Sequence, residues 1–333
     1  MVESHAAPAL ACPACRGPLN EWGRAYDCPA CRREFPCRFG FVDFRLGAVP
    51  DVDLEDDLAS AALLDERARD SSFKDLLRFH YERRPEASDA AHAAHLRHLE
   101  VESAQAERVF SNFEVGGTFL DLGCGLGRWL EAAAQRYDVR VGVDASLAQL
   151  VLARSYLAEQ GLEATLFAAE IERLPFPNES FDAAAATDVL EHVADPVVAI
   201  QEASRVLGAS GRFYAVTPNR FSLTAEPHVG VWGLGFLPRP WAERYVLNRF
   251  GIDYRSIRPF SWSRFQGALR SFGGETRADA LRPGPKELAG FTAGKLQAAK
   301  LYELLLKLPI VNALVRRAAP AFEAWARKPD ATL

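Results

Sequence analysis

A short glycine-rich segment constrains the fold of this chain more than any other feature. The run Phe119-Leu-Asp-Leu-Gly-Cys-Gly-Leu-Gly-Arg128 places the apolar residues of a buried strand directly before three glycines. Gly123, Gly125 and Gly127 permit a tight turn and let a ligand approach the backbone closely where the next helix begins. By itself this pattern fits either a nucleotide-binding loop or a plain tight turn, so the residues that follow must decide between them.

A second apolar strand, residues 139–143, ends at Asp144, which lies 23 residues after Asp121. A carboxylate in this place can accept hydrogen bonds from both ribose hydroxyls of an adenosine-containing ligand. The alternative is that Asp144 only caps the helix that begins near Leu147. Strand and helix signals then alternate as far as residue 217. This alternation predicts an α/β fold with a parallel sheet covered by helices.

Four ordered motifs make residues 110–220 resemble a class I S-adenosylmethionine-dependent methyltransferase. The motifs are residues 120–127, 143–144, 174–182 and 189–193. The resemblance implies a Rossmann-like, seven-stranded sheet with helices on both faces, and S-adenosylmethionine as the cofactor. It does not specify the acceptor of the methyl group.

The resemblance also implies a set of cofactor-binding residues: Asp121, Gly123, Cys124, Gly125, Asp144, Ala145, Glu170, Ile171, Thr187 and Asp188. Within this set, Asp121 and the glycine backbone would hold the methionine end, and Asp144 would hold the ribose. Glu170 and Ile171 would contact the adenine, although members of the family usually carry aspartate where this chain has Glu170. Cys124 is expected to be a small loop residue rather than a nucleophile, because no base is implied beside it.

Two histidines are candidates for catalysis if the acceptor is a hydroxyl group, because histidine is the usual general base near neutral pH. His192 follows the fourth strand, and His228 lies in a glycine- and aromatic-rich loop after the fifth strand. For both, the competing interpretation is an ordinary packing or lid residue. Methyl transfer itself is an in-line displacement that demands neither a metal nor a covalent nucleophile, so the protein mainly supplies orientation.

Four of the six cysteines form two Cys-x-x-Cys pairs separated by 12 residues, namely Cys12, Cys15, Cys28 and Cys31. This spacing is typical of a structural zinc site with four thiolates, and redox chemistry is the minority alternative. The segment resembles the zinc ribbon of tRNA-methyltransferase activator proteins. Bacterial 23S rRNA guanine-N1 methyltransferases carry a related ribbon, in which histidine usually stands at the place of Cys31. An RNA partner is therefore open, although second to a small-molecule acceptor.

The chain divides into a zinc ribbon (1–47), an acidic linker (48–72) and a methyltransferase domain (73–333) with a helical insertion near 285–318. We expect the linker to be a solvated tether, helical after Leu58, because charge runs of this kind usually face solvent. The net charge of -5 over 333 residues provides no global field for nucleic acid or anionic lipid. We expect a cytoplasmic protein, because there is neither a signal-peptide pattern nor an apolar run long enough for a transmembrane helix.

The segment 296–317 is unusually apolar but is interrupted by Pro309 and by charged residues. It could roof the acceptor pocket, form a homodimer contact or touch a membrane surface, in that order of preference.

Together the methyltransferase motifs, the candidate histidines and the zinc ribbon predict O-methylation of a small biosynthetic metabolite by direct transfer. The alternatives are an RNA base methyltransferase that grips RNA with the ribbon, and a non-catalytic scaffold that retains the cofactor.

Overall fold

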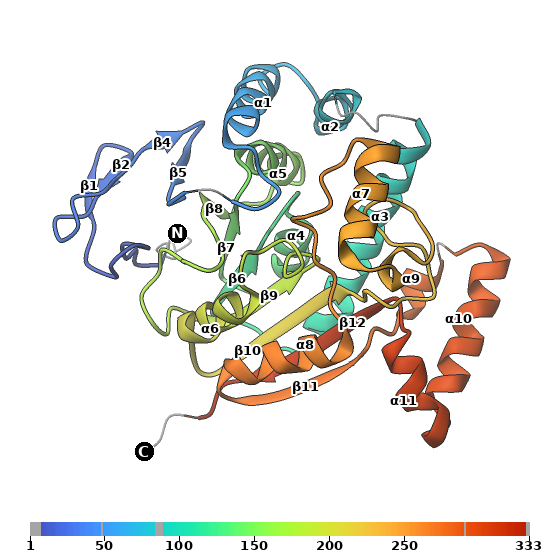
Figure 1. Ribbon diagram of the computed structural model, residues 1–333. Coiled ribbons are helices and arrows are strands. Elements are labelled where there is room, and N and C mark those ends of the chain that lie inside the picture. Colours follow the sequence, from blue (N-terminus) through green and yellow to red (C-terminus); the bar gives the residue numbers. More distant parts are fainter. Residues whose placement is uncertain (1–7, 48, 84–88, 290, 331–333) are drawn as a thin grey trace.

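The computed structural model describes residues 8–47, 49–83, 89–289 and 291–330. A central sheet lies between two layers of helices, with the ribbon at one edge and a helical pair near the opposite edge (Figure 1). The α/β architecture expected from the sequence is confirmed.

The described residues form a main sheet of nine strands in the order β11-β12-β10-β9-β6-β7-β8-β5-β4. Five central strands are parallel: β6 (Thr118–Leu122), β7 (Val139–Asp144), β8 (Thr165–Ala168), β9 (Phe181–Thr187) and β10 (Leu207–Pro218). On one side of them, β12 (Ala321–Arg327) and β11 (Glu275–Ala280) add an antiparallel pair. These seven strands correspond to the expected sheet, and two more extend it at the other edge.

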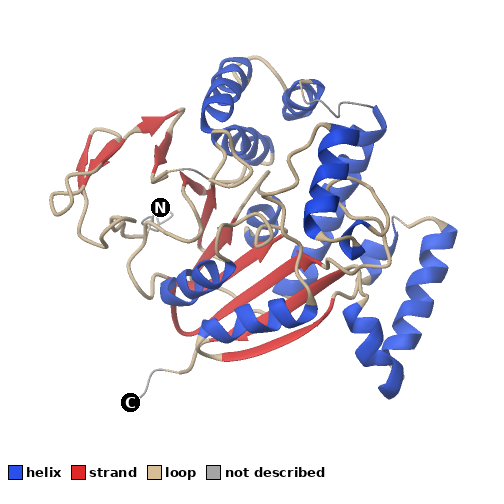
Figure 2. Cartoon of the chain, in the orientation of Figure 1, coloured by secondary structure: helices blue, strands red, loops and turns tan. Residues whose placement is uncertain are grey.

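Helices cover both faces of the sheet (Figure 2). One face packs on α6 (Pro196–Val206) and α8 (Trp262–Leu269), through residues such as Leu120 and Leu122. The other face packs on α3 (Asp89–Phe110), α4 (Arg128–Ala133) and α5 (Leu147–Glu159), through residues such as Phe119. Successive side chains of a strand point to opposite faces, so a strand buried on both faces is apolar throughout.

The ribbon is joined to the main sheet instead of standing apart from it. Its hairpin strands are β1 (Asn20–Trp22), β2 (Ala25–Asp27) and β3 (Glu34–Phe35), followed by β4 (Cys37–Arg38) and β5 (Phe41–Asp43). Strand β5 pairs in parallel with β8, and Phe44 is fully buried against Phe167 in the core of the larger domain. The ribbon therefore contributes the two additional strands of the sheet.

The acidic segment 48–72 contains the helix expected after Leu58, but it is not the solvated tether that its charge predicts. Residues Leu54–Arg67 form helix α1, which packs against α5, and Phe73–Glu82 form α2. The charge run is misleading because Asp57 is buried: its side chain is only 5% exposed and accepts hydrogen bonds from Leu147 N and Ala148 N at the start of α5. One acidic residue therefore serves as a structural anchor while its neighbours face solvent.

Among the described residues between β11 and β12 there are three helices: α9 (Pro285–Ala289), α10 (Ala293–Leu306) and α11 (Pro309–Arg317). In Figure 1, α10 and α11 lie side by side at the periphery. Neither helix contributes a residue to the main cavity, so the described residues do not support the expectation that they roof the acceptor pocket. No helix in the described part of the chain is long and apolar enough to cross a membrane.

Candidate functional site

A cavity of ≈1350 Å³ lies at the carboxyl ends of β6, β7, β8 and β9. Glycine or polar residues at the end of each of these strands, or just after it, line the cavity. They lie close together because parallel strands end at the same edge of a sheet. Helices α1, α2 and α3 and the loop at residues 224–228 supply much of the remaining wall, together with single residues near β10, β11 and β12. The cavity therefore lies where ligands bind in open α/β sheets.

Most of the residues predicted as cofactor-binding or catalytic line this one cavity: Gly123, Gly125, Asp144, Ala145, Glu170, Ile171, Thr187, Asp188, His192 and His228. The two exceptions are Asp121, on β6, and Cys124, within the glycine loop, which are buried and do not line the cavity. The individual ligand contacts of these residues stay predictions, but the fold brings their side chains to one place.

The glycine loop needs its glycines for two different reasons. Gly123 has φ +73°, and a Cβ at this residue would lie 2.5 Å from Val189 Cγ2. Gly125 has φ +47°, and a Cβ there would meet no protein atom within 4 Å. At Gly123 the protein itself therefore excludes a side chain, whereas at Gly125 the backbone faces open space where a ligand could approach it.

Asp144 stands between the glycine loop and the start of α5. Its Oδ2 accepts a hydrogen bond from Gly125 N at 2.9 Å, and its Oδ1 accepts one from Ser146 N at 2.8 Å. Burial raises the pKa of Asp144, and these two backbone hydrogen bonds partly oppose the rise. The cap of α5 itself is Ser146, which accepts from Gln149 N. The carboxylate therefore orders the glycine loop while still facing the cavity.

Asp121 is only 1% exposed, and its Oδ2 has no hydrogen-bond partner among the described residues. Burial raises the pKa of this carboxyl well above its ordinary value, with further contributions from Glu102 and Asp144. A buried carboxylate oxygen without a hydrogen-bond partner is costly, and Asp121 lies two residues before Gly123, which lines the cavity.

Glu170 is tied to the end of the ribbon, because its Oε1 accepts a hydrogen bond from Leu46 N at 3.0 Å. Burial raises the pKa of Glu170, and the Leu46 hydrogen bond partly opposes this rise. This contact explains why a glutamate suits the position usually held by aspartate. Its longer side chain reaches from the end of β8 to the ribbon. Glu170 still lines the cavity.

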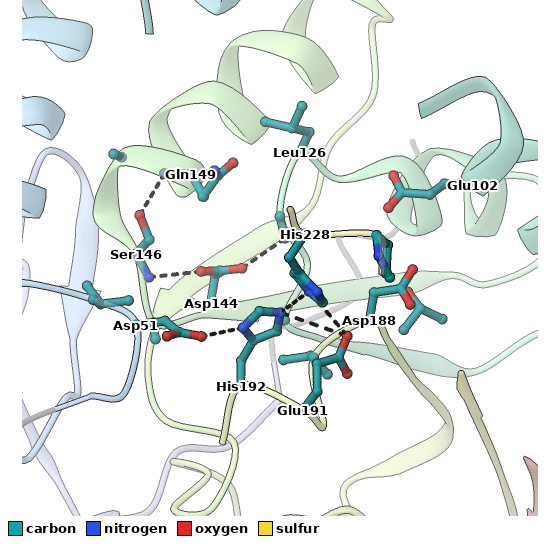
Figure 3. Close-up of a pocket in the computed structure, with 18 of the residues that line it drawn as sticks. Asp51, Glu102, Leu126, Asp144, Ser146, Gln149, Asp188, Glu191, His192 and His228 are labelled. Carbon is teal, nitrogen blue, oxygen red and sulfur yellow. Dashed lines mark hydrogen bonds and ion pairs between the residues drawn. The ribbon is translucent and has the colours of Figure 1, made fainter. Parts of the chain in front are cut away.

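His192 and His228 meet although they are 36 residues apart in sequence. Their Nε2 atoms are separated by 3.1 Å, and both lie close to Glu191 Oε1, at 3.8 Å from His192 and 3.9 Å from His228 (Figure 3). Glu191 is fully buried, and burial raises its pKa to about 8, with the His192 charge acting in the opposite direction. Sequence reasoning identified both histidines but overlooked Glu191, although it directly precedes His192.

The Nδ1 atom of each histidine contacts a carboxylate. His192 Nδ1 contacts Asp51, which comes from the segment expected to be a tether, and His228 Nδ1 lies 2.5 Å from Glu226 Oε1. Asp51 has a left-handed backbone, with φ +62°, which is uncommon for a residue other than glycine. No local pattern could have predicted the contact between Asp51 and His192, because it spans 141 residues.

The four predicted zinc-ligating cysteines also lie together. Cys12 Sγ is 3.6 Å from Cys31 Sγ, Cys15 Sγ is 3.4 Å from Cys28 Sγ, and all four sulfurs lie within 4.8 Å of one another. None of the four forms a disulfide. Both pairs sit in the same type of turn, in which the backbone N–H after the second cysteine donates to the first cysteine's carbonyl at 2.8 Å. Such a cluster suits a tetrahedral metal ion.

Residues 120–215 match the family model described as a methyltransferase domain. The chain contains a class I methyltransferase domain. This domain comprises the glycine loop, the strand that ends at Asp144, and the Glu191-His192 pair. The expectation drawn from the four sequence motifs is confirmed.

Curated relatives support the same assignment. The chain is 33% identical over 166 residues to a ubiquinone biosynthesis O-methyltransferase of Parvibaculum lavamentivorans, and the match covers 46% of this chain and 62% of that protein. A protein of the same name from Maricaulis maris is 33% identical over 175 residues, covering 52% and 63%. The chain thus spans less than two thirds of the length of these relatives.

Among solved structures, an S-adenosylmethionine-dependent methyltransferase from Mesorhizobium loti matches 68% of this chain and 98% of its own, with 20% identity and a TM-score of 0.47. YcgJ from Bacillus subtilis matches 71% and 99%, with 21% identity and a TM-score of 0.42.

Proposed function

We propose that the protein transfers the methyl group of S-adenosylmethionine to an oxygen atom of a small biosynthetic acceptor. The observation that carries this proposal is one cavity at the strand ends, where the glycine loop and Asp144 adjoin two histidines. Its volume of ≈1350 Å³ exceeds the roughly 300–1,000 Å³ of typical ligand pockets. A cofactor and a small acceptor can therefore occupy it together.

The residues present fit the cofactor. The unpartnered Oδ2 of buried Asp121 suits the ammonium group of its methionine end, and Asp144 suits the ribose hydroxyls. The open space at Gly125 lets the ligand lie against the backbone. When bound, S-adenosylmethionine supplies an activated methyl group on a sulfonium. What the chain must add is alignment of the acceptor and exclusion of water.

The histidine pair supports an oxygen acceptor. His192 and His228 both line the cavity with their Nε2 atoms close together, while Asp51 and Glu226 orient the rings through Nδ1. A ring nitrogen oriented in this way can act on the proton of an acceptor hydroxyl. The curated relatives whose name includes O-methyltransferase point to the same acceptor atom.

Transfer of isotope-labelled methyl groups tests this proposal. We expect labelled product with small hydroxylated aromatic acceptors and none with bulk tRNA or rRNA. A structure with S-adenosylhomocysteine should place its sulfur toward His192 and His228. Label in RNA but in no small acceptor would contradict the proposal.

RNA as the acceptor has less support, because two arginines of the ribbon form ion pairs with other residues of the protein. Arg16 pairs with Glu202 at 2.7 Å, and Arg45, whose side chain is 7% exposed, pairs with Asp43 and Asp57. Between residues 10 and 46, the ribbon's other four arginines, at positions 24, 32, 33 and 38, are matched by four acidic residues. RNA binding that weakens steeply between low and moderate salt would favour this alternative, because such a slope reports several phosphate contacts.

We also propose that the four clustered cysteines bind one structural zinc ion, in a closed site without an open coordination position. We expect Cys28→Ser to lose this zinc and to lower the free energy of unfolding by several kcal/mol, because metal binding and folding are coupled in such modules. Elemental analysis and thermal denaturation measure the two effects. Cys37→Ser is the matched control, since Cys37 lies outside the cluster. Equal zinc content in both variants would refute the assignment.

A further inference from the structure

We propose that Glu191, His192 and His228 form a second metal site, which binds a divalent first-row transition-metal ion at the wall of the cavity. All three residues line the cavity, and one ligand atom from each lies within 4.8 Å of the others. Two imidazoles and one carboxylate are a donor set that such ions favour. The site is separate from the four cysteines of the ribbon.

The distances between the three donor atoms fit an ion of this class. The separations are 3.1 Å between the two Nε2 atoms, and 3.8 and 3.9 Å from these to Glu191 Oε1. A point equidistant from three atoms with these separations lies about 2.1 Å from each, and zinc binds nitrogen and oxygen ligands at about 2.0–2.2 Å. The three side chains therefore need little movement to bind an ion.

The carboxylates next to the two Nδ1 atoms determine which ring nitrogens of His192 and His228 carry protons. His192 Nδ1 faces the Asp51 carboxylate and His228 Nδ1 faces the Glu226 carboxylate, so both Nδ1 atoms are donors. In neutral rings the two Nε2 atoms then carry lone pairs, which point toward each other across 3.1 Å. Such an arrangement is repulsive unless a cation or a shared proton lies between them. A carboxylate bound to the far nitrogen of a histidine is also the usual support of a metal-binding ring.

Glu191 adds an independent observation. Its side chain is fully buried and its Oε2 accepts a hydrogen bond from Thr217 Oγ1 at 2.9 Å, while its Oε1 has no hydrogen-bond partner among the described residues. The oxygen without a partner is the one that faces both histidines. A metal ion would satisfy this atom, whose burial without a partner is otherwise costly.

The open side of such an ion would face the cavity, because its three protein ligands all belong to the wall. An acceptor hydroxyl could then become a further ligand and bind in a defined orientation. This last step rests on the proposed function, and in this arrangement the two histidines act on the acceptor oxygen through the ion instead of as proton acceptors. Binding of the ion itself depends on neither cofactor nor acceptor.

Equilibrium dialysis of the full-length protein against Zn²⁺, followed by elemental analysis, tests the site without any activity measurement. We expect two zinc ions per chain at saturation, one at the cysteines and one at the new site. We expect His228→Gln and Glu191→Gln to bind one. His80→Gln is the matched control, because His80 lines the same cavity outside the cluster, and it should still bind two. A wild-type protein that saturates at one ion would overturn the proposal, as would variants that still bind two.

Cobalt spectroscopy keeps the test valid if a variant folds poorly. Adding Co²⁺ to wild-type protein whose ribbon already holds zinc should produce weak visible absorption bands without thiolate charge transfer, as expected for nitrogen and oxygen ligands. If these bands are absent, a shared proton between the histidines explains the short distance, and the metal site is refuted. Failure of methyl transfer in a separate assay would refute the proposed function but leave this result unchanged.

Discussion

Replacing Asp144 by alanine is expected to weaken binding of S-adenosylhomocysteine by at least ~100-fold. Two hydrogen bonds from the ribose to a charged carboxylate would contribute roughly 1.5–3 kcal/mol each, and their joint loss corresponds to about two to four orders of magnitude in affinity. The variant also loses the hydrogen bond that Asp144 Oδ2 accepts from Gly125 N, which orders the glycine loop. Isothermal titration calorimetry measures the change directly.

A matched control for this variant is Asp195→Ala. Asp195 is also a carboxylate at the start of a helix, since it caps α6 by accepting from Val197 N and Val198 N, but it does not line the cavity. Its loss should cost about 1 kcal/mol of stability and leave the affinity for S-adenosylhomocysteine unchanged. Asp144→Asn should give an intermediate affinity, because it keeps the size of the side chain and removes its charge. Wild-type affinity in a folded Asp144→Ala protein would exclude a role at the ribose.

The second large effect concerns stability. We expect Asp57→Ala to lower the free energy of unfolding by about 3–5 kcal/mol, the usual cost of removing one partner of a buried ion pair. Asp57 accepts from Ser146 Oγ at 2.6 Å, and it pairs with Arg45 at 2.9 Å. Burial alone would lower the pKa of Arg45, but Asp43 and Asp57 outweigh burial, so the guanidinium stays charged. Removing Asp57 therefore leaves a buried cation with fewer partners.

Urea denaturation of Asp57→Ala beside Glu55→Ala checks this expectation. Glu55 lies on the same helix, two residues earlier, and is exposed. Its replacement should cost at most ~1 kcal/mol, because it removes only a favourable charge near the helix N-terminus. Because domains of this kind are stable by only about 5–15 kcal/mol, the expected loss at Asp57 is a large share of the total. Equal midpoints for the two variants would mean that α1 is not anchored through Asp57.

The charge of the 48–72 segment shows why composition alone misled the interpretation of this region. Acidic runs usually face solvent. Here only the tertiary structure shows that Asp57 points at the first amides of α5, whose sequence starts about 90 residues later. Asp51 was missed for the same reason, because its partner His192 lies on a loop after β9. Neither contact leaves a periodic signal that a sequence could display.

The amino-acid sequence by itself determined the order of strands and helices, the glycine loop and the carboxylate at the end of the second parallel strand. It also determined the two Cys-x-x-Cys pairs of the ribbon. These features depend on neighbouring residues, because hydrophobic alternation, turn-forming glycines and knuckle spacing act within a few residues of the chain. Only the tertiary structure decided that the ribbon extends the sheet through β5 and β8. It also brought Glu191, His192 and His228 to one point, since packing alone sets distances between segments far apart in sequence.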